Sequence, residues 1–250
     1  LEFLTDSERV HTSVQGKLLM LRYCANSAPA HWLRLCAPDV TATAARAHDA
    51  LIDEALIGII GASTASPPER ARALSQACLP TAGFGGLGLA SAMASRHAAF
   101  VCRFASTWVA MRSFFPSVRE IDLAADDADA LPSVRQLQRS HALLMQTHTI
   151  VADTLAGLDA RPFDHDTFGD EKFQFHPPNL PPRSSLPSLS DFSNCDLKTL
   201  KTAQRNFTKV TNHCLWLDQY SSHSTDRRAT SVLICASQAH AGDFLNAIPT

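Results

Sequence analysis

The segment from Ser91 to Phe115 places the strongest constraint on what this chain can fold into. It runs for 25 residues without glycine or proline, which predicts one long α-helix. Its large apolar side chains recur every three or four positions and share one side of that helix: Phe100, Phe104, Trp108, Met111 and Phe115. We interpret this stripe as packed core rather than as a platform for stacking nucleobases. Arg96 and Arg103 flank it and are candidates either for phosphate contacts or for a solvated rim.

The other periodic segments of the N-terminal half also predict helices. Apolar residues recur at helical spacing in four stretches: 12–26, 30–36, 38–60 and 69–78. Gly61 is a C-terminal stop signal, and Ser66 with Glu69 forms a capping box before the last stretch. The predicted fold class is all-α: an irregular helical bundle with a proline-rich linker and a smaller C-terminal helical unit.

Residues 134–158 carry two interleaved seven-residue series, which predict a seam that packs against another helix. The series are Val134, His141, His148 and Leu155, and Leu137, Leu144, Val151 and Leu158. The two histidines are two turns apart, about 10 Å along a helix, which is too far to share one metal ion. We therefore expect them to be hydrogen-bonded polar positions within the seam.

Composition and charge divide the chain into four parts. These are a helical region with a glycine-rich loop at 1–119, an acidic connector and helix at 120–160, a proline-rich linker at 161–194, and a helical segment at 195–250. The net charge of −2 hides local values of +3 for 1–119, −7 for 120–194 and +2 for 195–250. Six prolines within 161–193 are typical of an extended linker. Asp126 and Asp127 lack the strand signals that surround the paired aspartates of polymerases, so we interpret them as an acidic loop.

The glycine-rich segment resembles a nucleotide-binding motif only in its spacing. Gly83, Gly85 and Gly88 match the G-x-G-x-x-G pattern, with Gly86 between them. A dinucleotide site also needs a preceding strand and an acidic residue about 20 positions later, and this sequence offers neither. We predict a structural loop in which glycine provides positive φ and close backbone approach while Phe84 is buried.

The sequence contains no recognisable catalytic or metal-binding constellation. Asp49 and Asp53 share one helix face, but no third ligand lies near them in the sequence, so we expect a solvated face. Asp164, His165 and Asp166 are interpreted as a solvated turn. The seven cysteines include no C-x-x-C pair and indicate reduced thiols. We expect no catalytic residue, metal, cofactor or small-molecule ligand, and an intracellular location in nucleus or cytoplasm, neither secreted nor in a membrane.

One charge pattern points to a binding function. Lys198, Lys201, Arg205 and Lys209 are spaced by three, four and four residues, which places four cations on one helix face. Apolar residues occupy the opposite face: Leu200, Ala203, Phe207, Val210 and Cys214. Such a helix can lie along a phosphate backbone, and it can also be an ordinary amphipathic helix of a soluble protein.

Several landmarks resemble the region that follows the polymerase palm in retrotransposon-type, non-LTR-like reverse transcriptases. They are Arg22-Tyr23-Cys24, Leu79-Pro80 with Gly85-Gly86-Leu87-Gly88-Leu89, Ala98-Ala99-Phe100, and the tail Ala241-Gly242-Asp243-Phe244-Leu245-Asn246. The resemblance covers about residues 12–115 and 195–250. The chain begins with Leu1 and the tail motif stops at Thr250, so we expect a piece of a longer protein.

The resemblance implies a thumb or connection region of an RNA-directed DNA polymerase that lacks the catalytic aspartates. We expect a non-catalytic helical fragment that supports template and primer binding. Its partners would be an RNA or DNA duplex at the basic helix face and other parts of the parent polyprotein. The alternative is a helical scaffold or adaptor that binds proteins through the 134–158 seam and the proline-rich linker, without nucleic acid.

Overall fold

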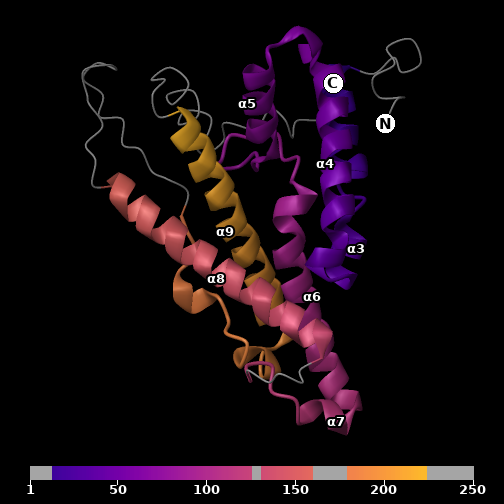
Figure 1. Ribbon diagram of the computed structural model, residues 1–250, viewed down its shortest axis with the longest axis vertical. Helices are drawn as coiled ribbons and strands as arrows, with labels where there is room; N and C mark the ends of the chain where they lie inside the picture. The colour runs from indigo at the N-terminus through magenta and orange to yellow at the C-terminus, as the bar shows by residue number, and fades with distance from the viewer. Residues whose placement is uncertain (1–12, 126–130, 160–178, 224–250) are drawn as a thin grey trace.

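The computed structural model describes residues 13–125, 131–159 and 179–223, and 77% of these residues are helical. No strand occurs within these ranges, so the predicted all-α class is confirmed. The long helices form a wedge-shaped bundle in which α6 (Ala92–Phe114) contacts elements from both halves of the chain (Figure 1). No helix in the described ranges has the length and apolar character needed to cross a membrane.

The N-terminal helices begin and end where the sequence signals predict. Helix α2 (Val14–Met20) continues into a π-helical turn at Leu21–Ala25, and α3 (Ala30–Leu35) follows. Helix α4 (Pro38–Ile60) stops at Gly61, whose φ of 68° is left-handed. The Ser66 N–H donates to Glu69 Oε2 at 3.0 Å in the capping box that starts α5 (Pro67–Cys78). Local capping chemistry therefore sets these boundaries.

The apolar stripe of α6 is core over only part of its length. Phe100 and Trp108 are buried, and Phe104 stacks on Trp108 with ring centroids 5.8 Å apart. Met111 and Phe115, in contrast, are 37% and 54% exposed. The prediction of one continuous packed stripe is wrong at this end, because α6 continues past the helices that cover it and leads into α7 (Pro116–Arg119) at the tip of the wedge (Figure 1).

Helix α8 (Pro132–Asp159) uses its predicted seam inside the fold, against α6 and α9 (Leu197–His223). The side chains of both series are buried except Leu158, which is half-buried. His141 Nε2 donates to the Pro187 carbonyl and His148 Nε2 to the Pro181 carbonyl, both at 2.9 Å. The two histidines are hydrogen-bonded seam positions, as expected, and their acceptors lie in the segment that follows α8.

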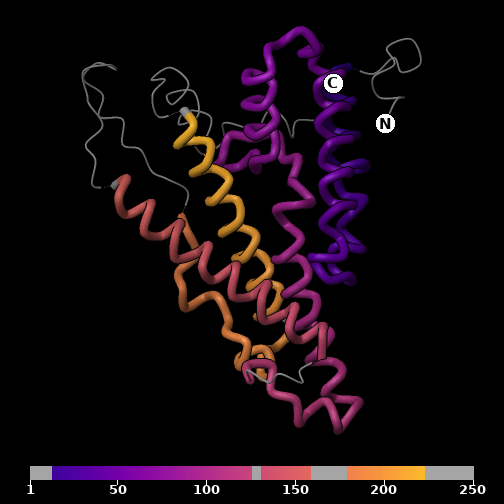
Figure 2. Tube along the Cα trace, viewed as in Figure 1, coloured from indigo at the N-terminus to yellow at the C-terminus, as the bar shows by residue number. Residues whose placement is uncertain are grey.

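Residues 179–193, which we call the strap, differ from the extended linker that their composition predicts. Leu186 is 4% and Phe192 0% exposed, and both belong to the same core cluster as residues of α6, α8 and α9. The strap includes short 3₁₀ turns at Arg183–Ser185 and Asp191–Ser193 and runs back along α8 (Figure 2). The strap is held against the bundle by the buried side chains of Leu186 and Phe192 and by the hydrogen bonds from His141 and His148. The Asp164–Asp166 triplet and Asp126-Asp127 lie outside the described residues.

Candidate nucleic-acid interface

Helix α9 presents the predicted basic face on a firmly packed support. Asp196 Oδ1 accepts the Thr199 N–H at 2.6 Å, which caps the start of the helix. Leu200, Ala203, Phe207 and Val210 are each at most 1% exposed and pack in the main core. Burial of this side forces the opposite side outward.

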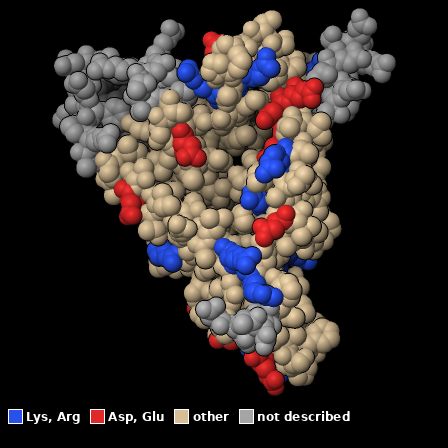
Figure 3. All heavy atoms as spheres, in the orientation of Figure 1, with Lys and Arg blue, Asp and Glu red and all other residues tan. Residues whose placement is uncertain are grey.

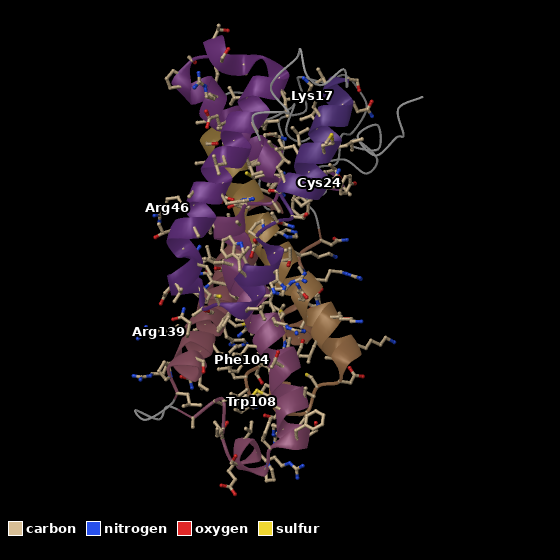
Figure 4. The ribbon with its side chains drawn as sticks, turned by 90° about the vertical axis from the view of Figure 1, so that its right-hand side faces the viewer. Lys17, Cys24, Arg46, Phe104, Trp108 and Arg139 are labelled. Carbon is tan, nitrogen blue, oxygen red and sulfur yellow. The ribbon has the colours of Figure 1, made fainter. Side chains whose placement is uncertain are left out.

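All four predicted cations lie on that outward side. Lys198, Lys201, Arg205 and Lys209 are exposed, and nitrogen-tipped side chains project from this half of α9 away from the bundle (Figure 4). None of the four forms an ion pair with a carboxylate of the described residues. Lys198 acts on Asp196, the cap of the same helix: the pKa of this carboxyl is lowered first by hydrogen bonds from Thr199 and further by the charge of Lys198.

The basic face has a defined length. From Lys198 to Lys209 the helix rises about 16 Å at 1.5 Å per residue. Trp216 continues the same side of α9 but is 0% exposed, in a cluster with Phe84 and Leu79 of the glycine-rich segment. The face therefore ends where the glycine-rich loop covers the helix, and it has room for a few successive phosphates.

The other two candidate arginines are on α6 and behave differently from each other. Arg103 is exposed. Arg96 is half-buried, its Nη1 donates to the Met93 carbonyl, and burial lowers the pKa of its guanidinium. Arg96 is thus bound to its own helix, and the structure groups the four cations of α9 without it.

The glycine-rich loop, residues 79–89, is a junction between elements. Gly83, Gly85 and Gly88 have φ values of 73°, 72° and 74°, whereas Gly86 does not have a positive φ. A Cβ on Gly86 would lie 1.9 Å from the Leu79 carbonyl oxygen, so this glycine is required by close approach. Phe84 contacts His213 of α9 edge-on at 5.0 Å. The loop thereby fixes α9 relative to α5.

The same loop uses its amides internally. The Gly86 N–H donates to the Pro80 carbonyl at 2.9 Å and the Gly88 N–H to the Leu79 carbonyl at 2.8 Å. The loop also follows helix α5 rather than a strand. These amides are not directed at a phosphate, and the geometry is that of a structural turn. Gly242, the last of the motif glycines, lies outside the described residues.

Asp49 has a role that sequence reasoning missed. Its carboxylate accepts the Ala92 N–H at 2.8 Å, the Met93 N–H at 3.0 Å and the Ser91 hydroxyl at 2.6 Å. The prediction that Asp49 lies on a solvated face is wrong. Helix α4 lies against the start of α6, and the Asp49 carboxylate accepts hydrogen bonds from the amides that the first turn of α6 leaves without helical partners. Burial, and then the charge of Asp49, raises the pKa of Asp53. The only signal in the sequence was the helix start at Ser91, which does not reveal a partner 42 residues away.

The remaining chemistry of the described residues offers no second site. No group of three His, Cys, Asp or Glu side chains in this part of the chain is placed to hold a metal ion. Burial raises the pKa of Cys78 and of Cys102 to about 12, so both thiols are protonated. A small cavity of about 20 Å³ beside Leu18, Arg22 and Leu89 has room for about one water molecule.

No protein-family model, no curated protein and no solved structure matches this chain.

Proposed function

We propose that this chain is a non-catalytic helical part of a retrotransposon-type reverse transcriptase-like protein, and that the basic face of α9 binds the phosphate backbone of a template–primer duplex. The observation that carries the proposal is the exposure of Lys198, Lys201, Arg205 and Lys209 on one face, without acidic partners in the described residues. Their helix is anchored by a fully buried opposite side, so the cations are held in a fixed row.

A row of fixed cations suits a duplex because phosphates repeat regularly along it. Helix contacts of this kind position a protein on nucleic acid without reading its sequence. The resemblance of the glycine-rich and Arg22-Tyr23 landmarks to the region after a reverse-transcriptase palm supports the same function. The parent would supply catalysis, and this region would hold its substrate.

The alternative, a helical scaffold that binds proteins, relies on the 134–158 seam and the proline-rich linker, and the described parts of both make contacts within the fold. The 134–158 seam is buried against α6 and α9, and the strap is packed on α8. Pro181 is buried, and the Arg183 Nη1 donates to the Met145 sulfur. Pro181 and Arg183 therefore make contacts within the fold, and residues 161–178 of the linker lie outside the described residues.

Fluorescence anisotropy with a labelled RNA–DNA duplex tests the proposal. Changing Lys198, Lys201, Arg205 and Lys209 together to Gln should weaken binding and reduce the slope of log K against log salt by up to about 3.6, the value for four phosphate contacts at about 0.9 each. The matched control changes four exposed arginines of other helices to Gln: Arg34, Arg46, Arg72 and Arg135. It removes the same charge and should leave most of the slope intact.

Two results would remove nucleic acid from the function of this helix. One is equally weak binding by the parent chain and the α9 variant at every salt concentration. The other is an equal loss in the α9 and control variants, which would show that only net charge matters.

A further inference from the structure

The outer face of α8, on the side opposite its buried seam, is unusually free of charge. Between Arg139 and Asp153 the sequence contains no Asp, Glu, Lys or Arg. Leu143 is 44% and Ile150 56% exposed on this face. Ala142, Gln146 and Thr149 complete it and are exposed as well. Figure 3 shows uncharged surface over α8 between acidic atoms toward one end and basic atoms toward the other.

The polar groups of this face are largely satisfied by their own helix. The Thr149 hydroxyl donates to the Met145 carbonyl of the same helix at 3.2 Å. The side chains of His141 and His148 point to the strap instead. Gln146 at the centre is left as the main polar side chain between the two charged ends.

Arg139 and Asp153 have no partners of opposite charge within the described part of the chain. Both are exposed, and their neighbours one turn away on α8 are Arg135, Leu143, Thr149 and Gly157. Figure 4 shows Arg139 projecting away from the bundle. Each lies seven residues from Gln146, so the two charges end the uncharged face symmetrically.

We propose that this face of α8 binds the same face of a second copy of this chain, in an antiparallel pair with a two-fold axis at Gln146. In that arrangement Arg139 meets Asp153 of the second copy at both ends, about 21 Å apart. Leu143 lies beside Ile150 of the second copy on one edge, and Ala142 beside Thr149 on the other. Each residue meets its counterpart twice, as a two-fold interface requires.

Charge selects this arrangement over the parallel one. A parallel pair would bring Arg139 against Arg139 and Asp153 against Asp153, and like charges at facing positions destabilise a helix pair. The contact involves only about four turns of one helix from each copy. Such a short contact buries less surface than the roughly 1,200 Å² of a stable interface. The dimer is therefore weak and depends on protein concentration.

Sedimentation equilibrium of the full chain over a range of concentrations, with circular dichroism as a check on folding, tests the proposal. Arg139→Glu alone, or Asp153→Arg alone, replaces two attractive pairs by two repulsive ones and should raise the dimer Kd at least about tenfold. The double variant R139E/D153R restores opposite charges and should return the Kd to within about threefold of the parent. Arg46→Glu and Glu54→Arg, exposed on α4, make the same charge changes elsewhere and should leave the Kd unchanged.

Three outcomes would overturn the proposal. A parent chain that stays monomeric at every concentration is the first. The second is a dimer that tolerates both single variants, or that the double variant fails to restore. The third is hydrogen exchange of residues 142–150 that proceeds at the same rate at every protein concentration while the chain associates, which would show that association uses another surface.

Discussion

Replacing Gly86 by Ala tests whether position 86 requires glycine because of close backbone approach and not because of a positive φ. The new Cβ would meet three atoms of Leu79: the carbonyl oxygen at 1.9 Å, the carbonyl carbon at 2.4 Å and the Cβ at 2.6 Å. Leu79 is 0% exposed, and its carbonyl accepts the Gly88 N–H. The loop must move as a unit to admit one methyl group.

The expected magnitude follows from what that movement disturbs. Overpacking a rigid site costs about 1 to 3 kcal/mol. Weakening the hydrogen bonds of Gly86 to Pro80 and of Gly88 to Leu79 adds about 1 kcal/mol each. The free energy of unfolding should therefore fall by about 3 to 5 kcal/mol, a large part of the stability of a domain this size.

Urea unfolding followed by far-ultraviolet circular dichroism measures the change, with two other glycines as controls. Gly83 has a φ of 73°, and a Cβ added there would have no atom within 4 Å, so Gly83→Ala should cost only the left-handed strain of about 1 to 2 kcal/mol. Gly157 lies within α8 with open space around it, and Gly157→Ala should stabilise by about 0.5 to 1 kcal/mol. If Gly86→Ala costs no more than Gly83→Ala, the reasoning from close approach is wrong.

Two further predictions concern the helix-capping role of Asp49 and the lowered pKa of His97. Asp49→Ala removes three acceptor contacts from the start of α6 and should lower the free energy of unfolding by about 2 kcal/mol; the exposed Glu54→Ala on the same helix is the control, and equal effects would contradict the capping role. Burial, and then Arg96, lowers the pKa of His97 from 6.5 to about 4, so between these pH values the unfolded chain binds a proton that the folded chain does not. Stability should fall as pH drops from about 6.5 toward 4, and more gently in His97→Gln; parallel pH profiles for the two proteins would refute this.

The sequence allowed most helix boundaries to be predicted because their signals are local. Gly61 and the Ser66–Glu69 capping box interact with residues only a few positions away, and both are found as predicted. The 134–158 series is a regular seven-residue spacing, and its side chains form the predicted buried seam. The basic face of α9 was likewise predictable from spacing, since the exposure of its four cations follows once the opposite side of the helix is buried.

Contacts between distant segments were not predictable in this way. Proline-rich composition describes the free chain, and it does not reveal that Leu186 and Phe192 fill a core or that His148 has an acceptor 33 residues away. Asp49 likewise resembles any exposed helix carboxylate until α6 is placed against α4. Gly86 could be assigned a structural role from the sequence, but its close approach to the Leu79 carbonyl depends on how the loop folds back on itself, which the spacing of glycines does not reveal.

The two proposed surfaces act independently because they lie on different sides of the bundle. Arg139 projects to one side in Figure 4, and the nitrogen-tipped side chains of α9 project to the other. An antiparallel pair through α8 therefore leaves two basic faces exposed, and a duplex long enough to reach both would bind the dimer more tightly than the monomer through effective concentration. The charge-reversed α8 variants should lose only this gain and keep the binding of a short duplex, whereas the α9 variant should lose both. If Arg139→Glu weakened short-duplex binding as strongly as the α9 variant does, the two surfaces would be parts of one site.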